Sequence, residues 1–376
     1  MRHITGWLLD AYAAPHNGLS VWVIDSKGVS HHFYDDIVPY FFIAGTECQL
    51  HAVCEWLAKS SYRVELRRAE RYEVFDRREI VVLQVRLLRV NEYALVVRRV
   101  CETFPTLRYY HADLTIPQFY FFEKDLFAFA QCEVVVDEDG HILEMASDDS
   151  VRALDYALPP LRTMTLALEG EKENPRNPAH GYRAPIVVGY EGNEYVLTEA
   201  SPKLMLEMLR AHLLRYDPDV ILSDYGDSFL LPYVMSLARE HGVDLPLNRD
   251  RAMHVRSRRA QSRFSYGRMM FQPESHWLFG RLHVDRQSAI LFDEYAWHGA
   301  VEMARISRRA FQHSARSTIG GAVSALENAI AYQSGCLIPL YQGFRLVVIS
   351  SGFARNLAGQ NEISRSARND KRKSCV

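Results

Sequence analysis

Hydrophobic and polar residues along the first 146 positions repeat with the periods of short strands and amphipathic helices. Apolar residues at helical spacing predict two helices, at residues 48–60 and 91–103. Residues 109–123 show no regular period and contain a dense aromatic run, so we expect irregular structure there. Apolar runs between turn residues predict strands at residues 21–25, 31–34, 39–44, 64–73, 79–89, 132–136 and 141–145. This order predicts one compact α+β module.

A second pattern begins after residues 147–160, a polar and acidic stretch that ends in two prolines. A strand, a hairpin, a helix with Pro202 at its first position, a central strand and another helix follow in that order. This order is typical of the ribonuclease-H-like fold, a mixed sheet flanked by helices. The expected strands are at residues 162–168, 185–189, 195–198, 220–223 and 281–285, and the later helices at 229–240, 293–305 and 320–334.

The pattern divides the chain into five expected segments. An N-terminal α+β domain (1–146) and a linker (147–160) precede a ribonuclease-H-like domain (161–310), a helical connector (311–340) and a basic tail (341–376). The tail has few large apolar residues, so it cannot bury enough surface to offset its ordering entropy, and we expect it to be disordered. The predicted fold class is therefore α/β.

Composition places the chain among globular proteins. With 48% apolar and 24% charged residues, the 376 residues can fill two or three cores. The balance of 44 basic against 46 acidic residues excludes a uniformly basic nucleic-acid coat, but not a local basic face. No apolar run approaches the roughly 18 residues of a membrane helix, and the N-terminus is not typical of a secretory signal. We therefore expect a cytoplasmic protein without a membrane partner.

The six cysteines form no C-x-x-C pair. Neither a zinc site nor a disulfide framework is therefore indicated. The histidines also lack the spacing of metal ligands. We expect the cysteines to be buried thiols and the histidines to have ordinary structural roles.

Three segments, in the same order, resemble the N-terminal and 3′–5′ exonuclease domains of family B DNA polymerases. Residues 110–124 are similar to the family's E-x-D-I-P-F…R-Y-L-I-D stretch. Residues 216–222 read Y-D-P-D-V-I-L and residues 229–233 read F-L-L-P-Y, which is similar to D-P-D-I-I…F-D-L-P-Y and is the most specific match. Residues 302–339 resemble the connection toward the polymerase palm. The resemblance covers residues 1–340.

The resemblance implies which carboxylates an active exonuclease needs, because the family holds two divalent metals on four of them. In the first motif, Ala167 stands in the place of the aspartate and only Glu169 remains. In the second motif, Leu230 follows Phe229 where an aspartate is expected. No Y-x-x-x-D motif occurs after that point. We therefore expect an inactive exonuclease site, with no assigned catalytic residue, metal ligand or cofactor.

Two alternatives stay open. Carboxylates at new positions could rebuild a site for Mg²⁺ or Mn²⁺ and give an active exonuclease, although acids at strand ends often cap neighbouring helices. The candidates for such an acidic cluster are Glu169, Asp224, Asp227 and Asp285. Alternatively, the chain is a truncated gene product. The palm motifs S-L-Y-P and D-T-D do not occur, so we expect that the chain cannot polymerise alone and that a separate subunit could carry the palm.

A basic segment at residues 254–270 contains arginines and aromatic residues but no acid. Arginine binds phosphate through two parallel hydrogen bonds, and an exposed aromatic ring stacks on a base with roughly 1–3 kcal/mol. An exposed basic hairpin without a ligand is an equal explanation from the pattern alone, but the resemblance favours binding of single-stranded or primer–template DNA. The predicted nucleic-acid-binding residues are Arg256, Arg258, Arg259, Arg263, Phe264, Tyr266 and Arg268. The sequence thus predicts a DNA-binding, non-catalytic polymerase portion that acts in replication or repair.

Overall fold

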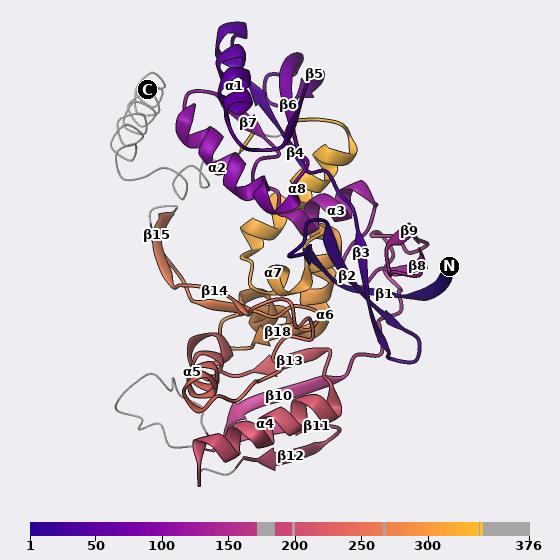
Figure 1. The fold of residues 1–376 in the computed structure, drawn as a ribbon, viewed down its shortest axis with the longest axis vertical. Coiled ribbons are helices and arrows are strands. Elements are labelled where there is room, and N and C mark those ends of the chain that lie inside the picture. Colours follow the sequence, from indigo (N-terminus) through magenta and orange to yellow (C-terminus); the bar gives the residue numbers. More distant parts are fainter. Residues whose placement is uncertain (171–184, 198–199, 266–267, 338, 341–376) are drawn as a thin grey trace, which may run out of the picture. The chain divides into compact units, whose positions relative to one another are not determined.

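The computed structural model describes residues 1–170, 185–197, 200–265, 268–337 and 339–340 (Figure 1). The chain forms two compact units. The first unit comprises Met1–Ile37 and Ile116–Ile330, and the second comprises Val38–Thr115 and Ala331–Val376. No helix among the described residues is long and apolar enough to cross a membrane.

The first unit contains an antiparallel sheet with the strand order β3-β2-β1-β8-β9. Its strands are β1 (Arg2–Ala13), β2 (Leu19–Asp25), β3 (Ser30–Asp35), β8 (Gln131–Val136) and β9 (Ile142–Ser147). The predicted strands β2 and β3 and the β8–β9 hairpin are confirmed, but the sequence pattern did not indicate β1. The strand is buried on both faces at Leu8 and Leu9 and carries a bulge between Leu8 and Asp10. A period of two is therefore absent from its sequence.

The second sheet of the first unit is mixed and has the order β12-β11-β10-β13-β18. Its strands are β10 (Thr163–Leu168), β11 (Ile186–Tyr190), β12 (Asn193–Val196), β13 (Val220–Ser223) and β18 (Leu282–Asp285). Strand β13 pairs in parallel with both β10 and β18, whereas β10, β11 and β12 pair antiparallel. The predicted α/β class with a mixed sheet is therefore confirmed.

Helices cover both faces of this mixed sheet. Helices α4 (Pro202–Tyr216) and α5 (Leu231–His241) pack on one face, in a core that includes Ile221. Helices α6 (Ile290–Ser307) and α7 (Phe311–Ala315) pack on the other, in a core that also includes Val220 and residues of β1 and β2. Successive residues of a strand point to opposite faces, and β13 accordingly contributes to both cores. Helix α8 (Ile319–Gln333) follows α7.

The second unit is built around an antiparallel sheet with the order β5-β6-β4-β7. The elements, in chain order, are β4 (Tyr40–Ala44), α1 (Glu47–Lys59), β5 (Val64–Glu73), β6 (Arg78–Leu87), a short 3₁₀ turn (Val90–Glu92), α2 (Tyr93–Thr103) and β7 (Arg108–Tyr110). A capping box between Thr46 and Gln49 starts α1. Leu337 packs on this sheet in a cluster with Phe42.

The expectation of irregular structure at residues 109–123 is wrong. The end of this stretch is helix α3 (Ile116–Glu123), and β7 precedes it. The aromatic residues of α3 are nearly all buried, from Phe119 at 0% to Phe122 at 5% exposure. A helix that is apolar on every side shows no amphipathic period, so the pattern could not reveal it.

The compact units do not follow the predicted domain boundaries. Residues 38–115 lie in a different unit from 1–37 and 116–146, although all were expected in one N-terminal domain. The boundaries of that domain, the linker and the connector stay predictions about how the chain folds. The predicted tail, residues 341–376, lies outside the described residues.

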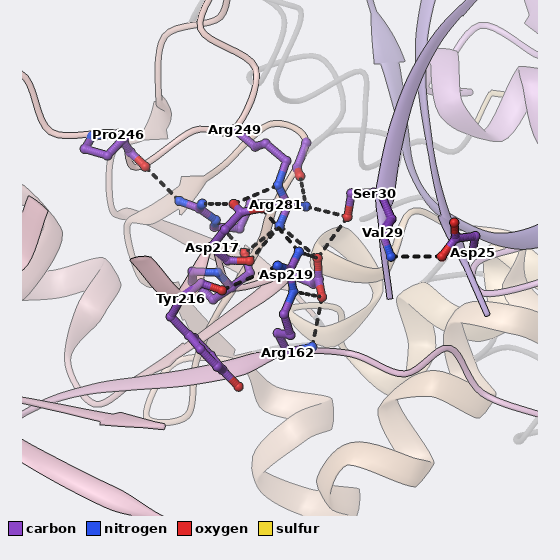
Figure 2. A network of polar contacts seen from close by, with 12 residues as sticks. Asp25, Val29, Ser30, Arg162, Tyr216, Asp217, Asp219, Pro246, Arg249 and Arg281 are labelled. Atoms are coloured by element: carbon purple, nitrogen blue, oxygen red, sulfur yellow. Dashed lines mark hydrogen bonds and ion pairs between the residues drawn. The ribbon is translucent and has the colours of Figure 1, made fainter. Parts of the chain in front are cut away.

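An ion-pair network around the buried Asp219 lies at the N-terminal ends of β10 and β13 in the first unit (Figure 2). Asp219 is 0% exposed, and its carboxylate accepts hydrogen bonds from Arg249 Nη2 at 2.8 Å, from Arg162 N at 2.8 Å and from Ser30 Oγ at 3.0 Å. Asp217 accepts from Arg249 Nε at 3.0 Å and from Arg281 Nη2 at 2.8 Å. Because Ser30 lies on β3, this network joins the two sheets of the unit. Both aspartates belong to the D-P-D segment of the resemblance.

We expect Asp219→Asn to lower the free energy of unfolding by about 3 kcal/mol, because it removes the buried carboxylate charge that pairs with Arg162 and Arg249. Urea unfolding monitored by circular dichroism measures this loss. Glu207→Gln is the control, since its pair with Arg210 lies at the surface and contributes under about 1 kcal/mol. Equal midpoints for Asp219→Asn and the wild type would show that the network does not stabilise the fold.

Candidate functional site

Three of the four predicted acids meet at one edge of the mixed sheet. Strands β13 and β18 end there in register, with Ser223 opposite Asp285. Asp224 follows β13 directly, and Asp227 lies in a short π-helical turn (Gly226–Leu230) before α5. The backbone N–H of Asp227 donates to Asp285 Oδ2 at 3.0 Å. The fourth acid, Glu169, is exposed and follows the end of β10.

Asp227 is fully buried, and its counter-ion is Arg316. Arg316 Nε donates to Oδ2 at 2.8 Å, and Arg316 Nη2 donates to Oδ1 at 3.1 Å. The backbone N–H of His276 and the hydroxyl of Ser288 donate to the same carboxylate. Burial by itself raises the pKa of Asp227, but the charge of Arg316 and these hydrogen bonds outweigh it and lower the pKa to about 2. Asp227 is therefore ionised and saturated with donors.

The other two acids at this edge, Asp224 and Asp285, differ in whether a guanidinium group is paired with them. Asp224 is held by Arg286 through two hydrogen bonds, Nε to Oδ1 at 3.0 Å and Nη2 to Oδ2 at 2.6 Å. Among the described residues, Asp285 accepts only from backbone N–H groups, those of Asp227 and Gln287. Its burial, together with the nearby charge of Asp227, raises the pKa of Asp285 to about 6.

Ser223, His283 and Asp227 are arranged in the order of a catalytic triad. His283 Nε2 lies 2.8 Å from Ser223 Oγ, and His283 Nδ1 lies 3.5 Å from Asp227 Oδ1. All three side chains are 0% exposed. Gly226 packs so closely here that a Cβ would lie 1.8 Å from Ser223 Oγ. Because no substrate can reach the serine, these residues form part of the core.

The residues at this edge do not fit two divalent metal ions. Ala167 and Leu230 stand where the resemblance requires carboxylates, and Leu230 is 0% exposed within the apolar core under α5. Two of the remaining acids already have guanidinium counter-ions. Within the described ranges, no group of three or more His, Cys, Asp or Glu side chains could hold a metal ion.

The basic segment forms part of a two-stranded ribbon. Strand β14 (Arg256–Arg258) pairs antiparallel with β17 (Ser275–Trp277), and Arg256 lies opposite Trp277. Arg258 Nη2 donates to Ser275 Oγ at 2.9 Å, and the guanidinium carbon of Arg258 lies 5.3 Å from the centre of the Trp277 ring. The equivalent distance for Arg256 is 6.0 Å. One face of the ribbon therefore presents two arginines over a tryptophan.

The remaining predicted binding residues follow β14. Arg259 is exposed. Arg263 and Phe264 lie on β15 (Gln261–Ser265) and Arg268 on β16 (Arg268–Gln272), which pair with each other. Tyr266 lies outside the described residues.

Sequence reasoning missed Trp277, His313 and Arg316 as neighbours of the basic segment. The His313 ring stacks on Trp277 with centroids 5.1 Å apart and 15° between the planes. The guanidinium carbon of Arg316 lies 6.0 Å from the centre of the same tryptophan ring. The only signal was that Arg316 falls inside the third segment of the resemblance, which carried no information about its contacts.

No family model matches the chain. Among curated proteins, it is 23% identical over 270 residues to the DNA polymerase of Archaeoglobus fulgidus, which covers 66% of this chain and 32% of that protein. It is also 41% identical over 56 residues to the DNA polymerase of Pyrococcus glycovorans, covering 15% of this chain and 7% of that protein. The chain thus spans about a third of the first relative's length.

Among solved structures, the chain matches the family B DNA polymerase from the hyperthermophilic archaeon Pyrobaculum calidifontis. The TM-score is 0.66 at 17% identity, over 90% of this chain and 51% of that chain. The fold described above is therefore that of a family B DNA polymerase over this part. Together with the archaeal homologues, this match confirms the resemblance to family B DNA polymerases.

We expect Asp285→Asn to change the pH dependence of stability. The pKa of Asp285 is about 6 in the fold against 3.8 in the unfolded chain, so its proton stabilises the fold below pH 4 and is lost as the pH rises through 6. The difference in unfolding free energy between variant and wild type should therefore shift in favour of the variant by up to about 3 kcal/mol between pH 4 and 7.

Urea unfolding at several pH values measures this difference. His283, whose pKa burial lowers to about 4, changes stability with pH in the opposite direction, but it does so in both proteins and cancels. A difference that stays constant across the pH range would show that the carboxyl of Asp285 titrates normally.

Proposed function

We propose that this chain is a DNA-binding, non-catalytic portion of a family B-like DNA polymerase that acts in replication or repair. The observation that carries the proposal is that two acids at this end of the sheet are paired with guanidinium groups of the chain. Arg316 neutralises Asp227 and Arg286 neutralises Asp224, each with two hydrogen bonds. These acids are thus satisfied by the chain itself and have no need of a cation from solution.

A site that lacks the metal-binding carboxylates also lacks the chemistry of an exonuclease. Two-metal hydrolysis needs one ion to activate water and both to stabilise the phosphate. Ala167 and Leu230 supply no oxygen ligand, and filling the site of a carboxylate with a core leucine excludes both water and metal there. We therefore infer that the exonuclease-like fold has been kept as a scaffold for binding.

DNA is the partner that the homologues and the basic ribbon favour. Arg256 and Arg259 are exposed, and Arg256 lies with Arg258 on the face of the ribbon that carries Trp277. This arrangement suits the backbone of single-stranded or primer–template DNA. Polymerisation would need a palm, which we propose a separate subunit supplies in the cytoplasm.

We expect Arg256→Gln/Arg258→Gln to weaken binding of a fluorescent single-stranded 15-mer by 10- to 100-fold at 0.1 M NaCl. Fluorescence anisotropy across a salt series should show a slope reduced by about 1.4, because each phosphate contact on a single strand contributes about 0.7. Arg210→Gln/Arg215→Gln is the matched control, since it removes two exposed charges of α4. Wild-type binding that is absent or independent of salt would refute the proposal.

We expect no metal-dependent digestion of a labelled single strand above the rate of a buffer control. The assay incubates the protein with the DNA and Mg²⁺ or Mn²⁺, and gel electrophoresis resolves shortened products. Glu169→Gln serves as the diagnostic variant, because Glu169 is the one carboxylate kept from the first motif. Digestion by the wild type that Glu169→Gln abolishes would establish the alternative function, an active exonuclease with displaced carboxylates.

A further inference from the structure

Trp277 occupies the centre of the basic ribbon and is 7% exposed. Arg256 and Arg258 approach its ring from β14, and His313 stacks on it from α7. The guanidinium carbon of Arg316 lies 6.0 Å from the centre of the ring. Residues of the ribbon and of the segment that follows α7 therefore place three guanidinium groups around one indole ring.

The indole N–H of Trp277 has no hydrogen-bond acceptor among the described residues. A buried donor without an acceptor is unusual, because it loses its hydrogen bond to water without a replacement. An acceptor from outside the protein, either solvent or a ligand, would satisfy this group.

Positive charge dominates the surroundings of this donor. Burial lowers the pKa of His313 to about 3, and the charges of Arg256, Arg309, Arg316 and Arg258 add to this effect. His313 is therefore neutral, and the charge of the cluster comes from guanidinium groups. Arg316 is neutralised by Asp227, whereas Arg256 forms no ion pair in the part of the chain that the structure describes. Arg256 consequently gives the cluster a positive charge that is available to a ligand.

We propose that Arg256, Arg258 and the indole N–H of Trp277 form a pocket for one phosphate group of the DNA backbone. A phosphate offers several acceptor oxygens at once, which suits two guanidinium forks and a neutral donor. The inference rests on the proposed DNA binding and deepens it, because it names the contacted group and adds a residue outside the basic segment. Arg256 and Arg258 supply charge, and Trp277 supplies a directional hydrogen bond.

The diagnostic variant is Trp277→Phe, which keeps an aromatic ring under the arginines but removes the N–H. We expect it to bind the single-stranded 15-mer about 3- to 10-fold more weakly, with an unchanged salt slope, because no charge is lost. Arg256→Gln should instead reduce the slope by about 0.7. Trp56→Phe, at a tryptophan of α1, is the control and should bind as the wild type does.

A second titration separates free phosphate from backbone phosphate. Inorganic phosphate is added to the preformed complex at constant ionic strength, with sulfate-free chloride buffer as reference. If the pocket binds free phosphate as well as backbone phosphate, the wild type should release the 15-mer at a lower phosphate concentration than Trp277→Phe does. A pocket specific for the backbone shows no such release, and the affinity loss of Trp277→Phe then carries the inference.

The failure of this inference is distinguishable from failure of the proposed function. If Trp277→Phe and Arg256→Gln both bind DNA with wild-type affinity and slope, the pocket is wrong and DNA binding stands. If the wild type binds no DNA, the proposed function fails, and calorimetry with inorganic phosphate decides on the pocket alone. If Trp277→Phe does not fold by circular dichroism, Trp277→Met, which also lacks the N–H, takes its place in both titrations with the same expected outcomes.

Discussion

The carboxylate of Asp219, buried without solvent contact, is the group on which the arrangement of the first unit depends. A buried charge is tolerated only with partners in good geometry, and here the partners come from three places in the chain: Arg162 before β10, Arg249 after α5 and Ser30 on β3. These hydrogen bonds hold the start of β13 beside its neighbours and join the two sheets. The D-P-D segment is thus an architectural element of the fold.

The same physical rule accounts for the opposite edge of the mixed sheet. Asp224 and Asp227 are paired with guanidinium groups that belong to the chain, while Ala167 and Leu230 occupy positions where the resemblance implies metal-binding carboxylates. A guanidinium supplies the charge and the two-pronged geometry that a carboxylate needs, but it cannot activate water as a metal does. In the function that we propose, cations of the protein itself have replaced dissolved metal ions, first as partners of the acids and then, on the ribbon, as partners of phosphate.

Local patterns predicted most of the regular elements well. Helix α1, strand β6 and the β8–β9 hairpin were found because half-buried elements show their period in the sequence. The second half of strand β1 and the aromatic residues of helix α3 were missed for the opposite reason, since they are buried on every side and show no period. The candidate site followed the same division. The acids and arginines of the resemblance were identified by residue type, but their pairing with Arg286 and Arg316, and the place of Trp277 under the arginines, depended on contacts between distant segments.

The amino-acid sequence by itself determined the fold class, the resemblance to family B DNA polymerases and the absence of carboxylates at two expected positions, because each of these depends on residue type and local order. The tertiary structure alone decided what the remaining acids do. Whether an aspartate holds a metal, a proton or an arginine depends on the charges within a few ångströms of it, and those come from residues such as Arg316 that lie 89 positions along the chain from Asp227. The charge balance at a site depends on tertiary packing, which brings together residues from several segments and so does not follow from any one of them.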